Sequence, residues 1–170
     1  MVWIEQLSVG NSVIDSDHKR LFGLINDIAC AAKTSDRFAL SLALKLFKDY
    51  MNHHSVNEEQ FAQAFNIPFG MHKVAHQNLQ MAIDFTMREL EKNSTAILFV
   101  MEHYAQFLLD WLVKHITEED MLMKSELQTH PYDFRPVGHT ELAQMKTGLR
   151  KAECRRKCFF LQNQHLEITP

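Results

Sequence analysis

Two pairs of residues in the sequence have the spacing of metal ligands on a helix. The stretch HKVAH places His72 and His76 four positions apart, and HHSVNEE separates His54 from Glu58 by the same interval. Residues four apart lie on one face of an α-helix, with Cβ atoms about 5–6 Å apart. Each pair can therefore direct its two side chains at one small target.

Three further residues extend this set to other parts of the chain. His18 lies within IDSDHKR, and His115 and Asp120 lie within HITEED. Imidazole nitrogen and carboxylate oxygen suit iron, copper, zinc and nickel, whereas calcium and magnesium prefer oxygen alone. Five imidazoles and two carboxylates exceed the needs of one tetrahedral zinc ion. The set predicts two metal ions, with the carboxylates as bridges.

Asp120 fits this set less simply than the other six residues. Five positions after His115, a regular α-helix has turned about 140° beyond one full turn, so the two side chains face different ways. Asp120 can join the set if it reaches around the helix, bridges two ions, or lies on a local π-type distortion. The spacing leaves these three possibilities open.

Taken singly, each of these patterns is a weak signal. An HxxxH or HxxxE pattern is common by chance, and a single histidine on an apolar face is more often a hydrogen-bonded core residue than a ligand. The joint presence of a contribution from every expected helix favours a metal site. Five histidines fit no part of it and are expected to be surface or structural residues: His53, His103, His130, His139 and His165.

The helices that must position these residues follow from apolar periodicity. Leu21, Leu24, Ile25 and Ile28 recur at three- and four-residue intervals and predict a helix over 17–33, with Asp15, Ser16 or Asp17 as its cap. Similar spacing predicts helices over 38–65, 71–90 and 94–127, separated by KTSDR, FNIPFG and EKNST. Short connections favour an all-α, antiparallel up-down-up-down four-helix bundle over residues 1–130.

Residues 131–170 are expected to form a linker and an extra C-terminal helix that begins near Thr140. Leu142, Met145, Leu149 and Ala152 open a heptad-like series that continues to Leu166. The segment is either a fifth helix folded on the bundle or a signalling helix that pairs two chains or joins an output domain. The two interpretations have equal support, since about three heptads are the minimum for a coiled coil.

Composition excludes several classes of protein. The chain has 170 residues, of which 46% are hydrophobic and 23% charged, as in a globular protein. A net charge of −3 gives no reason to expect a nucleic-acid partner. The sequence shows neither a signal peptide nor an apolar run of about 20 residues that would span a membrane. We expect a cytoplasmic protein.

Four stretches, IDSDHKRLFGLIN, HHSVNEEQF, HKVAH and WLVKHITEED, together resemble the bacterial hemerythrins, whose ligand pattern is His, HxxxE, HxxxH and HxxxxD. The resemblance runs from about Trp3 to Leu127. It implies a left-handed four-helix bundle around a non-haem di-iron centre that binds dioxygen reversibly. His72, His76 and His115 would hold one iron and His18 and His54 the other, while Glu58, Asp120 and an oxo or hydroxo group bridge the two.

The functions compatible with this site belong to different classes. An imidazole-rich site favours iron(II) and reversible binding, and Phe61, Trp111 and Leu112 are candidates to line an apolar pocket beside it. We therefore expect a dioxygen- or redox-sensing module of a signalling protein rather than an enzyme. A free oxygen carrier or store is the alternative, followed by a di-iron oxidase or peroxidase. A histidine-rich structural bundle would bind no stoichiometric metal.

Overall fold

Long stretches of the sequence without helix-breaking residues form helices, and these helices make up the regular structure of the described residues. The computed structural model describes residues 3–92 and 96–129, and within these ranges every regular element is a helix. The elements are η1 (Glu5–Leu7), α1 (Ser12–Lys33), α2 (Arg37–Ala64), α3 (Gly70–Glu91), α4 (Ala96–His115), the π-helical segment η2 (Ile116–Asp120) and α5 (Met121–Thr129). The expected all-α class is confirmed.

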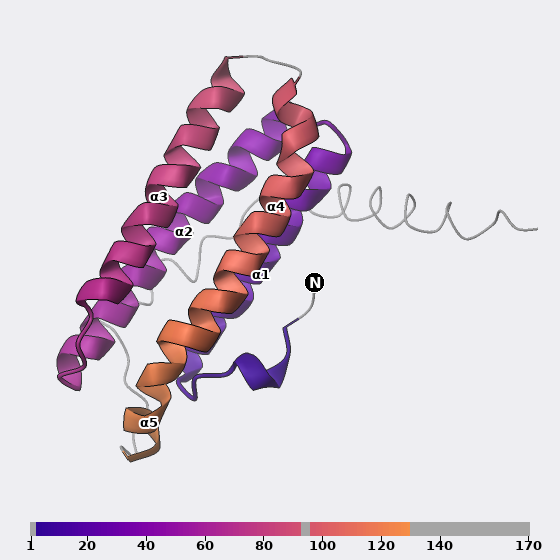
Figure 1. The fold of residues 1–170 in the computed structure, drawn as a ribbon. Coiled ribbons are helices and arrows are strands. Elements are labelled where there is room, and N and C mark those ends of the chain that lie inside the picture. The colour runs from indigo at the N-terminus through magenta and orange to yellow at the C-terminus, as the bar shows by residue number, and fades with distance from the viewer. Residues whose placement is uncertain (1–2, 93–95, 130–170) are drawn as a thin grey trace, which may run out of the picture.

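The helices run up and down beside one another, as Figure 1 shows. Reversals at residues 34–36 and 65–69 separate α1 from α2 and α2 from α3. Helix α1 packs against α2 and α4, and α2 packs against α3. The segments α4, η2 and α5 follow one another along the fourth rod, which ends at the lower end of the view in Figure 1. The four-helix bundle is confirmed, and the helix expected from Thr140 lies outside the described residues.

The start of the first helix differs from the sequence-based expectation. Helix α1 begins at Ser12, because the side chain of Asn11 accepts hydrogen bonds from the backbone N–H groups of Val13 and Ile14 at 3.0 and 3.2 Å. Asp15, one of the expected caps, instead accepts the backbone N–H of Val9 at 2.9 Å and the hydroxyl of Ser8 at 2.5 Å. Asp15 therefore connects the segment that precedes α1, at Ser8 and Val9, to the first turn of the helix by hydrogen bonds.

The core follows the apolar periodicity of the sequence. The predicted α1 positions Leu21, Leu24, Ile25 and Ile28 are all buried. On α2 and α4 the buried positions include Leu40, Leu44, Phe47, Met51, Met101, Leu108 and Leu112. Val100 differs, since it is 54% exposed although the α4 pattern placed it on the apolar face. In the described part of the chain, no helix is both long and apolar enough to span a bilayer.

Candidate metal centre

The antiparallel arrangement brings all seven candidate ligands together at one end of the bundle. They come from the beginning of α1 and α3, the end of α2 and α4, and η2. These helix ends meet at the same end because alternate helices run in opposite directions. All seven side chains are buried: His18, His54, Glu58, His72, His76, His115 and Asp120.

Glu58 lies between two groups of imidazoles. Its Oε1 atom is 3.7 Å from Nε2 of His18 and 3.3 Å from Nε2 of His54. Its Oε2 atom is 3.1 Å from Nε2 of His72 and 3.3 Å from Nε2 of His76. One oxygen of the carboxylate therefore faces each group.

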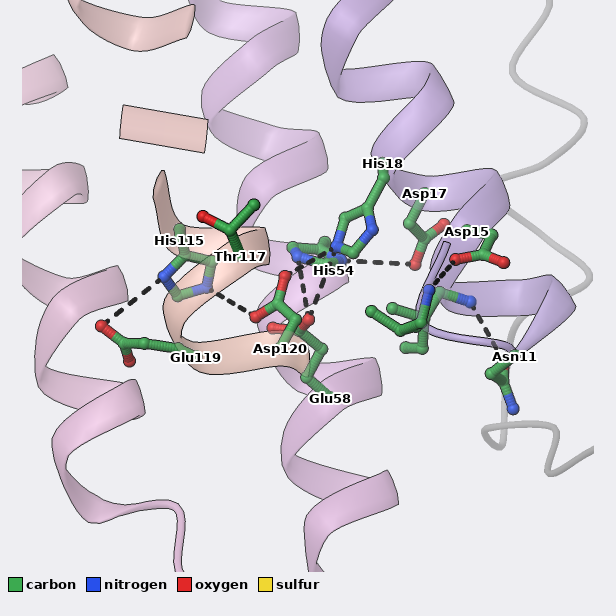
Figure 2. Close-up of polar contacts among 12 residues, drawn as sticks. Asn11, Asp15, Asp17, His18, His54, Glu58, His115, Thr117, Glu119 and Asp120 are labelled. Carbon is green, nitrogen blue, oxygen red and sulfur yellow. Dashed lines mark hydrogen bonds and ion pairs between the residues drawn. The ribbon is translucent and has the colours of Figure 1, made fainter. Parts of the chain in front are cut away.

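Asp120 divides its two oxygens in the same way. Its Oδ2 atom is 3.0 Å from Nε2 of His18, while Oδ1 is 3.2 Å from Nε2 of His72 and 3.1 Å from Nε2 of His115. Figure 2 shows the carboxylates of Asp120 and Glu58 between His115 on one side and His18 and His54 on the other.

The π-helical segment η2 accounts for the position of Asp120. It spans Ile116–Asp120, directly after His115. A π-helix closes hydrogen bonds between residues five apart, so residue i+5 returns to the face of residue i. Of the three possibilities that the sequence left open, the structure contains the local distortion, and it also presents Asp120 to both groups of imidazoles.

The side chains form two adjoining groups that are able to hold metal ions. One contains Glu58, His72, His76 and His115, and the other contains His18, His54, Glu58 and Asp120. Within each group, one nitrogen or oxygen per residue lies within 4.8 Å of the others. A mixed imidazole and carboxylate shell suits first-row transition metals.

Several of these atoms lack the hydrogen bonds that burial normally demands. Nε2 of His18 and His54, Oε1 of Glu58 and both oxygens of Asp120 have no hydrogen-bond partner. Buried polar atoms are almost always paired, so a cluster of unpaired ones needs an explanation. All of these atoms can donate an electron pair, and they approach one another without hydrogen-bond geometry. A cation bound between them would require this arrangement. The residues fit a metal.

Carboxylates and burial shift the pKa values of the imidazoles in opposite directions. Burial alone lowers the pKa of His18, but contact with Asp120 and Glu58 outweighs it and raises the pKa to about 9. The same balance raises the pKa of His72 to about 10. For His76, burial prevails over the attraction of Glu58, and the pKa falls to about 3.

The two carboxyl groups remain ionised despite complete burial. Burial raises the pKa of Asp120, but the adjacent His115 and the other imidazoles hold it well below its usual value. Burial and Asp120 both raise the pKa of Glu58, and His54, His18 and His72 more than reverse this effect. The cluster therefore holds two negative charges, which protons on His18 and His72 balance in the metal-free protein and which metal ions would balance in their place.

Aromatic rings cover several of the imidazoles. Trp111 stacks on His115 with ring centroids 4.5 Å apart and planes 13° apart. Phe69 lies 4.4 Å from His72, and Trp3 stacks on His18 at 6.2 Å. Phe61 and Leu112, expected with Trp111 to line an apolar pocket, are both buried. Trp3 and Phe69 were not predicted, because they precede their helices and no periodicity assigns them to a face.

A second set of polar residues, also not predicted, lies behind His54. Asp17 is fully buried and accepts hydrogen bonds from the hydroxyl of Tyr50 and from Nδ2 of Asn57, both at 2.7 Å. Although burial raises the pKa of Asp17, interactions with His54, Tyr50 and Asn57 lower it overall. Desolvation and the hydrogen bond to Asp17 raise the pKa of Tyr50 above its usual value.

Five histidines were expected to lie outside the metal site, and the two of them that the structure describes do so. Nε2 of His53 lies 3.2 Å from Nδ2 of Asn57 and His53 belongs to neither group of ligands, while His103 is exposed. His130, His139 and His165 lie outside the described residues.

Fold and site together define a helical bundle with two adjoining groups of side chains that can hold metal ions. The model of the hemerythrin HHE cation binding domain matches residues 9–127, and the chain belongs to the hemerythrin family. Bacteriohemerythrin of Stenotrophomonas maltophilia is 24% identical over 134 residues, which cover 79% of this chain and 86% of that protein. A hemerythrin-like protein of Naegleria gruberi is 27% identical over 74% of this chain and 92% of its own length.

Solved structures agree with this assignment. A wild-type hemerythrin crystal structure superposes with a TM-score of 0.68 and 25% sequence identity, over 75% of this chain and 97% of that one. The expected resemblance to bacterial hemerythrins is confirmed at the level of the family.

Proposed function

We propose that this protein binds two iron ions through the seven buried residues and binds dioxygen reversibly at this centre, behind side chains that exclude solvent. One observation carries the proposal: Glu58 and Asp120 each direct one oxygen at His18 and the other at His72. A carboxylate placed in this way serves two cations at once. The oxo or hydroxo bridge of the family belongs to the same proposal.

The imidazoles divide unequally between the two sides. His72, His76 and His115 serve one side, and His18 and His54 serve the other. With one oxygen from each carboxylate, the first side offers three imidazoles and two oxygens, and the second offers two imidazoles and two oxygens. The second side has one protein ligand fewer and would therefore leave room for an external ligand. An iron pair held by these residues would supply the electrons that dioxygen binding requires.

The surrounding residues favour binding over turnover. Mostly neutral imidazoles stabilise iron(II), and the rings of Trp3, Phe69 and Trp111 lie against His18, His72 and His115. We expect these rings to limit the access of water and protons to the site. We therefore propose that the protein binds dioxygen and is not an enzyme. We also propose that it acts inside the cell.

We further propose that dioxygen binding serves sensing. The family match ends at residue 127, and the heptad-like spacing from Leu142 to Leu166 follows it in the sequence. A signalling helix in this segment would pair two chains or join an output domain. A free oxygen carrier or store is the alternative.

The test is the iron content of the purified protein together with its visible spectrum. We expect two irons per chain and a charge-transfer band that disappears on reduction with dithionite and returns in air. Zinc alone, or no metal, would refute the proposal. An oxygenated form that oxidises within minutes supports sensing, one that persists for hours supports carriage, and steady consumption of reductant and dioxygen would identify an oxidase.

A further inference from the structure

Asp17 and His18 are neighbours in the sequence but face different parts of the centre. His18 directs Nε2 at Glu58 and Asp120. Asp17, which is fully buried, places Oδ2 at 3.8 Å from Nδ1 of His54, on the side of that ring away from the carboxylates (Figure 2). Asp17 is therefore not in either ligand group, yet it faces a member of one.

Two residues of α2 hold the Asp17 carboxylate in place. The hydroxyl of Tyr50 donates to Oδ1 and Nδ2 of Asn57 donates to Oδ2, both at 2.7 Å. Tyr50 and Asn57 lie four residues before and three residues after His54 on the same helix. The helix that carries His54 thus also fixes the group that faces it.

Among the described residues, Asp17 is the carboxylate that lies near the outer nitrogen of His54. Nδ1 of His54 has no hydrogen-bond partner, while Nε2 lies 3.3 Å from Oε1 of Glu58. An imidazole that gives Nε2 to a metal carries its proton on Nδ1, and a carboxylate beside that proton fixes the tautomer and strengthens the ligand. Nδ1 of His18 and of His76 also lacks a partner, and in the described part of the chain no carboxylate oxygen lies within 4.0 Å of either nitrogen.

We propose that Asp17 is a positioning residue that fixes the tautomer and orientation of His54 and strengthens its bond to the metal on the two-imidazole side. This inference rests on the proposed function in one respect, that His54 binds a metal. Its consequence is that Asp17 acts on only one of the two ions, the one with the fewer protein ligands.

The other side of the centre provides a matched control. Oε1 of Glu119 lies 3.9 Å from Nδ1 of His115, which belongs to the three-imidazole group. The side chain of Glu119 is 34% exposed, whereas that of Asp17 is fully buried. Water competes with a partly exposed carboxylate, so Glu119→Gln removes the same kind of charge with a smaller effect.

The experiment measures the affinity of the whole chain for zinc, in two steps, by competition with a chelator. We expect Asp17→Asn to weaken one step by about 10- to 100-fold and to leave the other unchanged. Tyr50→Phe keeps the carboxylate but removes one donor, so it should weaken the same step by less. Glu119→Gln should bind both ions nearly as the unmodified protein does. Unchanged zinc affinity in both Asp17→Asn and Tyr50→Phe would overturn the proposal.

A second readout separates positioning from a general loss of structure. In zinc-loaded protein with ¹⁵N-labelled histidine, we expect Asp17→Asn to shift the Nδ1–H resonance of His54 while those of His72 and His76 keep their positions. Equal shifts at all imidazoles, or none, would refute a role specific to His54. One further outcome is that the unmodified protein binds two zinc ions and yet fails to bind dioxygen when it is loaded with iron. In that case the proposed oxygen function fails while the inference about Asp17 stands.

Discussion

Oδ1 of Asp120 lies 3.1 Å from Nε2 of His115, although Asp120 is five positions after His115 in the sequence. The π-helical segment η2 closes this distance by returning Asp120 to the face of His115. Glu119 has the i+4 spacing that a regular helix would use, and its carboxylate lies near the outer nitrogen of His115, at 3.9 Å. The π-helix thus determines which of two adjacent acidic residues enters the centre.

Replacement of Asp120 by alanine should remove metal from both sides, because its two oxygens face both groups of imidazoles. We expect less than one bound ion per chain, measured by elemental analysis after loading with iron(II) under anaerobic conditions. Glu119→Gln is the control and should retain two. Full loading of the Asp120→Ala variant would show that Glu119 can substitute for Asp120, and hence that the π-helix does not determine the ligand.

The fold could be predicted from the sequence because its signals are local. Periodic apolar residues such as Leu21 and Ile28 define a helix face within a few turns, and both are buried. The start of α1 was placed too late because several residues in succession can cap a helix, and the geometry of the loop selects Asn11. Residues after 129, including the expected helix from Thr140, lie outside the described part of the chain.

The residues of the candidate site also fall into those that local spacing predicts and those that depend on how the helices pack. The pairs His54 with Glu58 and His72 with His76 are visible because residues four apart share a face. The placement of Asp120 could not be decided, since a π-helix depends on packing as well as on spacing. Asp17 was missed because its contacts come from Tyr50 and Asn57, which are 33 and 40 residues away. Such contacts become evident only when the helices are packed.

Replacement of His76 by alanine should abolish dioxygen binding and reduce bound iron while the protein remains helical. Nε2 of His76 lies 2.8 Å from Nε2 of His115 and 3.3 Å from Oε2 of Glu58, so its loss weakens the three-imidazole side. The checks are iron content, the visible spectrum in air and circular dichroism. His103→Ala, at an exposed position of α4, should behave as the unmodified protein. A normal oxygen adduct in the His76→Ala variant would contradict the assignment.

Metal uptake should release protons, because a metal binds only the neutral imidazole. With pKa values of about 9 and about 10, His18 and His72 carry protons at pH 7 in metal-free protein. We expect about two protons per chain on loading with zinc at pH 7, and an affinity that rises with pH until these imidazoles are neutral. Calorimetry in two buffers of different ionisation enthalpy measures the release. Binding without proton release would show that neither imidazole is a ligand.

The same pKa values predict how the stability of metal-free protein depends on pH. The pKa of His76, lowered to about 3, makes the unfolded chain bind more protons below pH 6.5, so stability falls as the solution is acidified. The raised values of His18 and His72 stabilise the fold below pH 6.5, and this contribution is lost as the pH rises through about 9 and about 10. These three histidines together place the maximum of stability near pH 6.5. Urea unfolding from pH 5 to 10 in the presence of EDTA tests this.

Bound metal should remove most of this alkaline loss. A cation that binds the folded state alone stabilises it by mass action, by about 4 kcal/mol when its concentration is 1,000 times the dissociation constant. It also replaces the protons on His18 and His72, so the folded state no longer loses them as the pH rises. We therefore expect zinc to raise the melting temperature more at pH 9 than at pH 6.5. Equal shifts at both pH values would indicate that zinc binds elsewhere, since only ligands that exchange protons for metal produce the difference.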